Sequence, residues 1–247
     1  VHGLYYPPTH PTCTAAGAPP ALVHIHGGPT SIANNGFNGE AAYFTSRGYA
    51  YVEVNYRGST GYGRTYREAL RQRWGEVDVE DAASCAHALN EQGLADPKRL
   101  IIIGGSAGGY TVLNALIHHP GLFKAGICQY GVTNLFALDL DTHKFEAHYN
   151  ASLVGHLPEA AGRYHAWSPV FHAEAIRDAL YIFQGSEDVV VPPSQSEEIV
   201  SALRARGTPH KYKVYEGEGH GFRKSENIAD YLKETERFLQ QQVLFAP

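Results

Sequence analysis

Residues 101–110 read IIIGGSAGGY, with three isoleucines followed by five small residues around one serine. Glycine-rich turns of this kind either cradle a phosphate or expose a nucleophile. A dinucleotide fingerprint fails because Ser106 or Ala107 stands where its second glycine belongs, and a Walker loop fails because Tyr110 replaces its lysine. The pattern G-x-S-x-G fits residues 104–108, between an expected strand and an expected helix. The stretch therefore predicts a serine on a sharp strand-to-helix turn.

The small residues around Ser106 follow from the geometry of such a turn. A strand that turns sharply into a helix holds the serine in a strained backbone conformation, where bulky neighbours would collide. The hydroxyl then projects at the carboxyl end of the sheet, beside a helix N-terminus whose free N–H groups stabilise an oxyanion. A bare G-x-S-x-G also arises as a purely structural turn, so the partners of a nucleophile have to come from elsewhere in the chain.

A serine hydroxyl needs a general base, and the base needs an orienting carboxylate. In hydrolases with this turn the chain order is Ser, then Asp or Glu, then His, on loops that follow later strands. Asp188 follows the expected strand 179–185, and His220 follows the expected strand 210–217. Because parallel strands end at one edge of a sheet, both side chains are expected beside Ser106.

Other side chains near these loops are expected to have surface roles. Glu187 is the alternative to Asp188, which is preferred because aspartate is the more frequent orienter of such a histidine. Glu216 and Glu218 flank the histidine loop and are expected to be solvated, and His210 is expected to be an exposed residue at a strand start.

A second loop can supply the other half of an oxyanion site. A tetrahedral intermediate needs one donor from the residue after the nucleophile and one from the loop after an earlier strand. The first is the N–H of Ala107. HGGP at 26–29 follows the expected strand 21–27, and the N–H of Gly28 is the candidate for the second donor. Taken alone, HGGP also reads as a plain Gly-Pro turn.

Outside the serine turn, strand-like and helix-like stretches alternate. Residues 134–178 interrupt this alternation with scattered aromatics, typical of an insertion or a pocket wall. The pattern predicts an α/β fold with a mostly parallel sheet and helices on both faces. Strands are expected over 21–27, 48–58, 99–104, 124–131, 179–185 and 210–217, and helices over 40–48, 64–74, 76–93, 108–120, 194–207 and 225–242.

Composition and charge limit the classes of function. The 247 residues, 43% hydrophobic and 18% charged, suit one sizeable core, so a single domain over 1–247 is expected. A net charge of -5, with no Lys/Arg run longer than two, argues against nucleic acid or an acidic membrane surface as partner. No apolar run approaches the ~20 residues of a membrane span. The N-terminus lacks the basic start and apolar core of a signal peptide.

The cysteines and histidines indicate neither a disulfide framework nor a metal site. The three cysteines are scattered and form no CxxC pair, which favours a reducing compartment and a cytoplasmic location. The close histidine pairs have no Cys or carboxylate at ligand spacing, so no metal is expected. The residues concerned are Cys13, Cys85 and Cys128, and the pairs His24 with His26 and His118 with His119.

The chain contains six motifs, in the order HGGPTS, NYRGSTGYGR, RWGEVDVED, GGSAGGYTVL, FQGSEDVVVPP and GEGHGF. Together they resemble the catalytic domain of the prolyl oligopeptidase family of serine peptidases, most of all its acylaminoacyl-peptidase and dipeptidyl-aminopeptidase branch. The likeness runs from about Tyr5 to Phe238. It implies an α/β-hydrolase fold with Ser106 as nucleophile, His220 as general base and acid, and Asp188 as its orienter.

Members of this family usually carry an N-terminal β-propeller that restricts entry to short peptides. The chain begins at Val1, without Met, at a strand shortly before HGGP, which agrees with a catalytic domain separated from its propeller. The resemblance therefore implies short peptide substrates, a propeller partner outside this chain, and no metal or organic cofactor.

Several positions depart from the family pattern or extend it. Some relatives carry Arg or Asn two residues after the catalytic Asp to bind a substrate carbonyl; here Val190 stands there, and with Val191 it would make that wall apolar. Ala107 replaces the tyrosine of certain dipeptidyl peptidases and leaves room beside the nucleophile. Arg57 is expected either to support the oxyanion loop or to lie at the surface.

Segment 129–150 matches the family region that forms the pocket for the residue before the scissile bond. An apolar pocket is therefore expected there, with core packing as the alternative for each member. Its apolar and aromatic members are Tyr130, Leu135, Phe136, Phe145 and Tyr149.

Three functions remain open on the sequence. The first is a peptidase that cleaves short peptides through an acyl-enzyme. The second is a carboxylesterase with the same triad, because ester hydrolysis needs less assistance to the leaving group than amide hydrolysis. The third is a catalytically silent α/β binding module.

Overall fold

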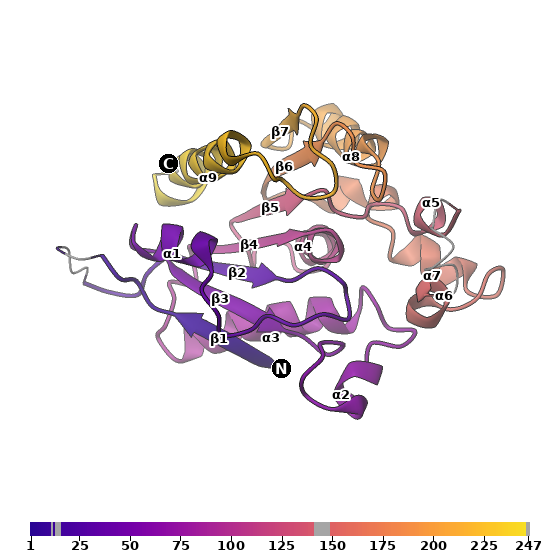
Figure 1. Cartoon of the computed structure of the whole chain (residues 1–247), viewed down its shortest axis with the longest axis horizontal. Coiled ribbons are helices and arrows are strands. Elements are labelled where there is room, and N and C mark those ends of the chain that lie inside the picture. The colour runs from indigo at the N-terminus through magenta and orange to yellow at the C-terminus, as the bar shows by residue number, and fades with distance from the viewer. Residues whose placement is uncertain (11, 13–15, 141–148, 246–247) are drawn as a thin grey trace.

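A seven-stranded sheet runs through the computed structural model, which describes residues 1–10, 12, 16–140 and 149–245 (Figure 1). The strand order is β1-β3-β2-β4-β5-β6-β7, and all neighbours are parallel except β1, which pairs antiparallel with β3. The expected mostly parallel sheet is thus confirmed. The strands are β1 (His2–Tyr6), β2 (Ala21–Ile25), β3 (Ala50–Asn55), β4 (Leu100–Gly105), β5 (Ala125–Gln129), β6 (Ala179–Gly185) and β7 (His210–Tyr215).

Helices cover both faces of this sheet (Figure 1). Two of them pack on one face, where their buried side chains share a hydrophobic core with the strands. Three others share a second core with the opposite face. The first pair is α1 (Gly39–Thr45) and α9 (Ser225–Leu239), and the others are α3 (Val77–Glu91), α4 (Ala107–His118) and α8 (Pro193–Arg206).

The isoleucines before the serine turn are buried on both faces of the sheet. Ile101 and Ile103 lie in one core with Phe44 of α1, whereas Ile102 lies in the other core with Val112 of α4. Burial on both faces explains why this strand is an uninterrupted apolar run rather than an alternating one.

The predicted helix over 64–74 is wrong in its second half. α2 (Arg64–Glu68) is a single short helix, after which the backbone leaves helical geometry. Gln72 has a positive φ of 54° and donates its N–H to the carbonyl of Ser152 at 3.1 Å. Trp74 is buried in the core. Tertiary contacts therefore replace the helical hydrogen bonds that composition alone favours here.

The segment over 134–178 holds short helices rather than another strand–helix repeat, which confirms the predicted interruption. Residues 141–148 lie outside the described part of the chain. The elements of this segment are α5 (Leu135–Leu140), α6 (Tyr149–Val154), α7 (Ala161–Ala166) and the 3₁₀ turns η1 (Pro169–Phe171) and η2 (Ala173–Ala175). Outside it, a π-helical turn, η3 (Gln240–Leu244), follows α9.

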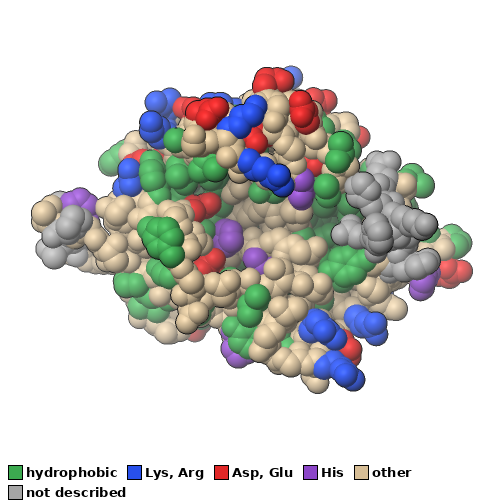
Figure 2. Space-filling model, viewed as in Figure 1, with side chains coloured by type: hydrophobic (Ala, Val, Ile, Leu, Met, Phe, Trp, Pro, Cys, Tyr) green, Lys and Arg blue, Asp and Glu red, His purple; other side chains and the backbone are tan. Residues whose placement is uncertain are grey.

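The parallel strands point the same way, so the loops after them meet at one edge of the sheet (Figure 1). Sheets of this class place ligands at that edge. The space-filling view, seen from the same side as Figure 1, shows a hollow near the centre of the molecule with histidine side chains in it (Figure 2). Over the residues that the structure describes, no helix is both long and apolar enough to cross a membrane.

Candidate active site

Ser106 sits on the sharp turn that the sequence predicts. It connects β4 to α4 with φ 56° and ψ -122°, a strained conformation for a residue with a side chain. A Cβ atom on Gly104 would lie 2.7 Å from the backbone of Gly108, and one on Gly108 would collide with the carbonyl oxygen of Ile25. Glycine is required at both positions because the first turn of α4 crosses directly over β4 and β2.

The loops after β6 and β7 bring two further side chains to this serine. The Nε2 atom of His220 lies 2.8 Å from the Oγ atom of Ser106, and its Nδ1 atom lies 2.8 Å from the Oδ2 atom of Asp188. Because a carboxylate only accepts, Nδ1 carries the proton, and Nε2 is left free to accept the serine proton. The three residues thus form the hydrogen-bonded chain that activates a serine.

Asp188 is buried, with 3% of its surface exposed, and both of its oxygens are engaged. Oδ1 accepts the N–H groups of Val190 and Val191 at 2.9 Å each, and Oδ2 accepts a long bond of 3.3 Å from the side-chain amide of Gln184. These donors leave Oδ2 turned toward the histidine. The neighbouring Glu187 is exposed, so it does not take this place.

The two valines after Asp188 act here through their backbone. The side chain of Val191 is 1% exposed and belongs to the hydrophobic core, which corrects the expectation that it lines a pocket wall. The side chain of Val190 is 38% exposed and remains available to a substrate. The difference arises because successive side chains of this turn point in opposite directions while both N–H groups converge on Oδ1.

The HGGP loop lies against the serine turn. A Cβ on Gly27 would lie 3.6 Å from the Cβ of Ser106, so the loop backbone closely approaches the nucleophile. Gly28 has φ 126°, a conformation that favours glycine, and no hydrogen bond runs from its N–H to another group among the described residues. Ala107 is the first residue of α4, and its N–H has no partner within the helix. Both N–H groups are therefore free for a ligand.

Residues of the NYRGSTGYGR segment hold the HGGP loop in place. The hydroxyl of Tyr56 lies 3.1 Å from the carbonyl oxygen of His26 and 2.9 Å from that of Pro29, and so reaches both ends of the loop. The Nδ1–H of His26 donates to the carbonyl of Gly27, which leaves its Nε2 to accept from the hydroxyl of Ser59 at 2.8 Å. Burial lowers the pKa of His26, so its ring is neutral.

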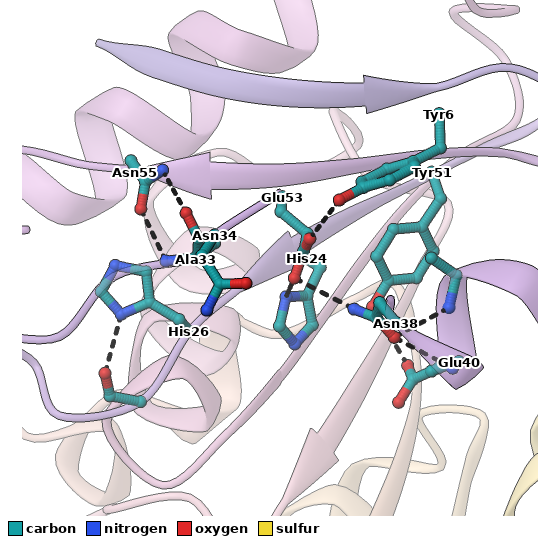
Figure 3. Close-up of polar contacts among 12 residues, drawn as sticks. Tyr6, His24, His26, Ala33, Asn34, Asn38, Glu40, Tyr51, Glu53 and Asn55 are labelled. Atoms are coloured by element: carbon teal, nitrogen blue, oxygen red, sulfur yellow. Dashed lines mark hydrogen bonds and ion pairs between the residues drawn. The ribbon is translucent and has the colours of Figure 1, made fainter. Parts of the chain in front are cut away.

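The rest of the loop is anchored to β3. Asn55 donates to the carbonyl of Ala33 and accepts its N–H, as a backbone partner would (Figure 3). Farther along, Asn38 caps α1 with its oxygen and donates its amide to Glu53. The loop is thus tied to the neighbouring strand along most of its length.

Arg57 does not support the oxyanion loop. Its guanidinium contacts Asp81 at 2.8 Å and Glu80 at 2.9 Å, both on α3. Its neighbours in the same motif, Asn55 and Tyr56, provide that support instead, through the hydrogen bonds to Ala33, His26 and Pro29 described above.

Tyr130 follows β5 and lies beside the triad. It has a positive φ of 38°, and its N–H donates to the carbonyl of Phe183 at 2.7 Å. Its ring contacts the imidazole of His220 and also lies over Gly105, where a Cβ would approach it to 3.1 Å. Burial raises the pKa of Tyr130 to about 12, so the phenol stays protonated.

The other residues expected in an apolar pocket are dispersed. Leu135 is buried in the core, and Phe136 packs against Tyr164. The hydroxyl of Tyr149 lies 2.6 Å from the Oγ1 atom of Thr30, just past the HGGP loop. Phe145 lies outside the described residues.

The histidine pairs of the sequence do not gather metal ligands. Across the described ranges, no group of three or more His, Cys, Asp or Glu side chains could hold a metal ion. Burial lowers the pKa of His24 to about 4, so this histidine is neutral beside Glu53. Cys85 and Cys128 are free thiols buried in the core.

The family model described as the prolyl oligopeptidase family matches residues 35–244. The chain belongs to the prolyl oligopeptidase family. This confirms the resemblance seen in the six motifs and, with the sheet, the α/β-hydrolase fold.

Three named proteins are similar to this chain over most of its length. A solved puromycin-hydrolyzing peptidase of Mycobacterium tuberculosis is 44% identical with a TM-score of 0.95, and the match covers 100% of this chain and 38% of that one. The dipeptidyl aminopeptidase BIII of Pseudoxanthomonas mexicana is 33% identical, with 92% of this chain and 34% of the relative covered. The acylamino-acid-releasing enzyme of Arabidopsis thaliana is 32% identical, with coverages of 81% and 27%. The chain thus spans about a third of the length of these relatives.

Proposed function

We propose that this chain is the hydrolytic part of a serine peptidase that cleaves amide bonds of short peptides and aminoacyl amides. The observation that carries the proposal is the pair of 2.8 Å contacts from Ser106 through His220 to Asp188. A serine hydroxyl is a poor nucleophile alone, and such a chain supplies both the proton acceptor and its orientation.

In the acylation step the Oγ atom of Ser106 bonds to the carbonyl carbon of the substrate, and its proton passes to Nε2 of His220. The carbonyl oxygen becomes an oxyanion, which the N–H groups of Gly28 and Ala107 stabilise. The intermediate then breaks its C–N bond, and the imidazolium returns the proton to the departing amine. The acyl group remains as an ester on Ser106.

In the deacylation step water takes the place of the amine. His220 accepts a proton from water, and the resulting oxygen bonds to the ester carbonyl carbon. The C–O bond to Ser106 then breaks, and the proton on Nε2 restores the serine hydroxyl. Asp188 keeps its negative charge throughout and stabilises the imidazolium formed in each half of the cycle.

The substrate class is supported by the named relatives and by the surroundings of the serine. The solved relative at 44% identity is named a puromycin-hydrolyzing peptidase, and puromycin is an aminoacyl amide of a nucleoside. The side chain of Ala107 is 3% exposed and belongs to the hydrophobic core, so it does not supply the room that the sequence suggested, whereas the exposed side chain of Val190 offers an apolar contact. We therefore propose an apolar acyl side chain, and Tyr130 and Val190 as its contacts.

The test compares substrates on the purified chain and on Ser106→Ala. The substrates differ in their acyl group and in their leaving group. They are aminoacyl-p-nitroanilides, acetylated aminoacyl-p-nitroanilides, puromycin and p-nitrophenyl esters. We expect turnover of at least one amide, lost in Ser106→Ala. Turnover of esters alone would favour the carboxylesterase, and no turnover of any substrate would favour the silent binding module.

An upstream β-propeller and a cytoplasmic location stay predictions. The propeller is supported by the length of the relatives, of which this chain covers 38% or less in the three comparisons above. The coding sequence upstream of Val1 tests both, because a propeller domain there would support the first prediction and an export signal would contradict the second.

A further inference from the structure

A buried carboxylate lies two residues before the triad histidine. Glu218 was expected to be solvated, but only 2% of its surface is exposed. Its Oε1 atom accepts the N–H of Lys224 at 2.9 Å and the side-chain amide of Asn227 at 2.8 Å, and Oε2 accepts the N–H of Arg223 at 3.0 Å. The expectation is wrong because donors from the start of α9 fold back over this side chain.

These donors keep Glu218 ionised. Burial alone would raise its pKa, but the hydrogen bonds from Asn227 and from the N–H groups of Lys224 and Arg223 outweigh burial and lower it. A charged carboxylate that accepts three hydrogen bonds is a strong local anchor.

The backbone of Glu218 is tied to the other triad loop. Its carbonyl accepts the N–H of Glu187, the residue before Asp188, at 2.9 Å. One residue earlier in each loop, the N–H of Gly217 donates to the hydroxyl of Ser186 at 2.9 Å. Glu218 thus joins the loop that carries Asp188 through its backbone, and it joins the start of α9 through its side chain.

His220 lies between these two attachments, in a loop with little rigidity of its own. Gly217, Gly219 and Gly221 surround it, and glycine has more conformational freedom to lose than any other residue. A loop of this composition needs an external anchor to hold an imidazole at one orientation.

We propose that Glu218 is a positioning residue for His220, which holds the imidazole in line between Ser106 and Asp188. The inference rests on the proposed function of the triad. Its chemical consequence concerns the proton on Nε2, because return of that proton to an amine needs the imidazole close to the leaving nitrogen. An activated ester releases p-nitrophenolate, which needs no such proton.

The test compares Glu218→Gln with Glu216→Gln, the same change at an exposed glutamate two residues earlier in the loop. Glutamine keeps the shape of the side chain but loses its charge. Its amide nitrogen faces a backbone N–H group and cannot accept that hydrogen bond. For Glu218→Gln we expect kcat on an amide to fall by about 10- to 100-fold at little-changed KM, since misplaced catalytic groups cost rates of this order. The ratio of amide to p-nitrophenyl ester turnover should fall, and Glu216→Gln should resemble wild type.

A proton NMR signal gives a readout that does not depend on turnover. The Nδ1 proton between His220 and Asp188 should resonate at low field in wild type, and broaden or vanish in Glu218→Gln. Should Glu218→Gln fail to fold, Asn227→Ala removes a single hydrogen bond to the carboxylate. This variant should weaken the low-field signal and lower the ratio of amide to p-nitrophenyl ester turnover.

The two proposals fail in different ways. A wild-type chain that hydrolyses no substrate contradicts the proposed function, while the low-field signal still tests Glu218. An active wild type whose folded Glu218→Gln variant keeps the kcat, the amide-to-ester ratio and the signal of Glu216→Gln overturns the positioning role and leaves the proposed function standing.

Discussion

The phenol ring of Tyr130 lies against the imidazole of His220, with 4.8 Å between the ring centroids and 60° between the planes. The ring also contacts Phe222, so it forms one wall of the space in which the imidazole stands. We expect Tyr130→Phe to keep wild-type activity. We expect Tyr130→Ala to lower kcat by about 10-fold through loosened orientation of the imidazole, and to raise KM because the ring is also a proposed contact of the substrate. Steady-state kinetics on an amide substrate measure both constants. A raised KM with unchanged kcat would show instead that Tyr130 acts only by contacting substrate.

The hydroxyl of Tyr56 joins the two ends of the HGGP loop and so fixes the N–H of Gly28. Tyr56→Phe removes those bonds and should lower kcat by about 10-fold, less than the ~10²–10³ lost with a whole oxyanion donor. Tyr5→Phe is the matched control, because Tyr5 also donates to a backbone carbonyl but sits on β1. Equal kcat values for the two variants would contradict a role of Tyr56 at the oxyanion site.

The acidic member of the triad can be assigned with two isosteric changes. Asp188→Asn should lower kcat by about 10⁴-fold, because the amide favours the wrong imidazole tautomer. Glu187→Gln alters an exposed side chain and should leave kcat within about 2-fold, as surface changes usually do. A large loss in Glu187→Gln with an active Asp188→Asn would reverse the assignment.

The serine turn predicts a stability effect at Gly108. A methyl group there would collide with the carbonyl oxygen of Ile25, so Gly108→Ala should lower the free energy of unfolding by about 2 kcal/mol or more. Gly162→Ala is the control: this glycine of α7 has open space around it, and alanine should stabilise the helix by about 0.5–1 kcal/mol. Urea unfolding measures both. Undiminished stability of Gly108→Ala would contradict the close crossing of α4 over β2.

Asp78 predicts a dependence of stability on pH. It is fully buried, and burial raises its pKa to about 6 even though Thr111 and Gly75 donate hydrogen bonds to it. An unfolded Asp titrates near pH 4, so the folded chain binds more protons between about pH 4 and 6. The stability that this group contributes is present below pH 4 and is lost as the pH rises through 6.

Asp78→Asn stays neutral and should therefore lose this dependence. We expect the variant to exceed wild type by about 1–3 kcal/mol at pH 8 and to equal it near pH 4, from a pKa difference of about two units. Urea unfolding across this range, with Glu226→Gln as an exposed control, measures the difference. A variant less stable than wild type at pH 8 would show that the charged form is the favoured one in the fold.

The triad could be predicted because its geometry follows from chain order. If residues 101–110 are assigned as a strand that turns into a helix, Ser106 lies at the carboxyl edge of the sheet. The later parallel strands then bring the loops with Asp188 and His220 to that same edge. The mostly parallel sheet and the interruption over 134–178 follow from the same alternation. The HGGP loop is found in this way too, since it follows an earlier strand of the sheet.

Residues that support the site could not be predicted, because their partners are distant in sequence. Glu218 is buried only because the start of α9 folds back over it, and no local pattern records that contact. Tyr56 reaches the HGGP loop because β3 lies next to β2, whereas chain order alone left Arg57 as the candidate. The expected helix 64–74 ends early for the same reason, since contacts with α6 take over its backbone.

Covalent labelling of Ser106 tests the central claim most directly. A fluorophosphonate reacts with a serine only where a base and an oxyanion site activate it, so it reports on the triad without any choice of peptide substrate. We expect intact-mass analysis to show one adduct on the folded wild-type chain, mapped to Ser106 by digestion, and none on Ser106→Ala or after unfolding in urea. A folded wild-type chain that stays unlabelled, or labelling that persists in Ser106→Ala, would contradict the assignment of this turn as the catalytic site.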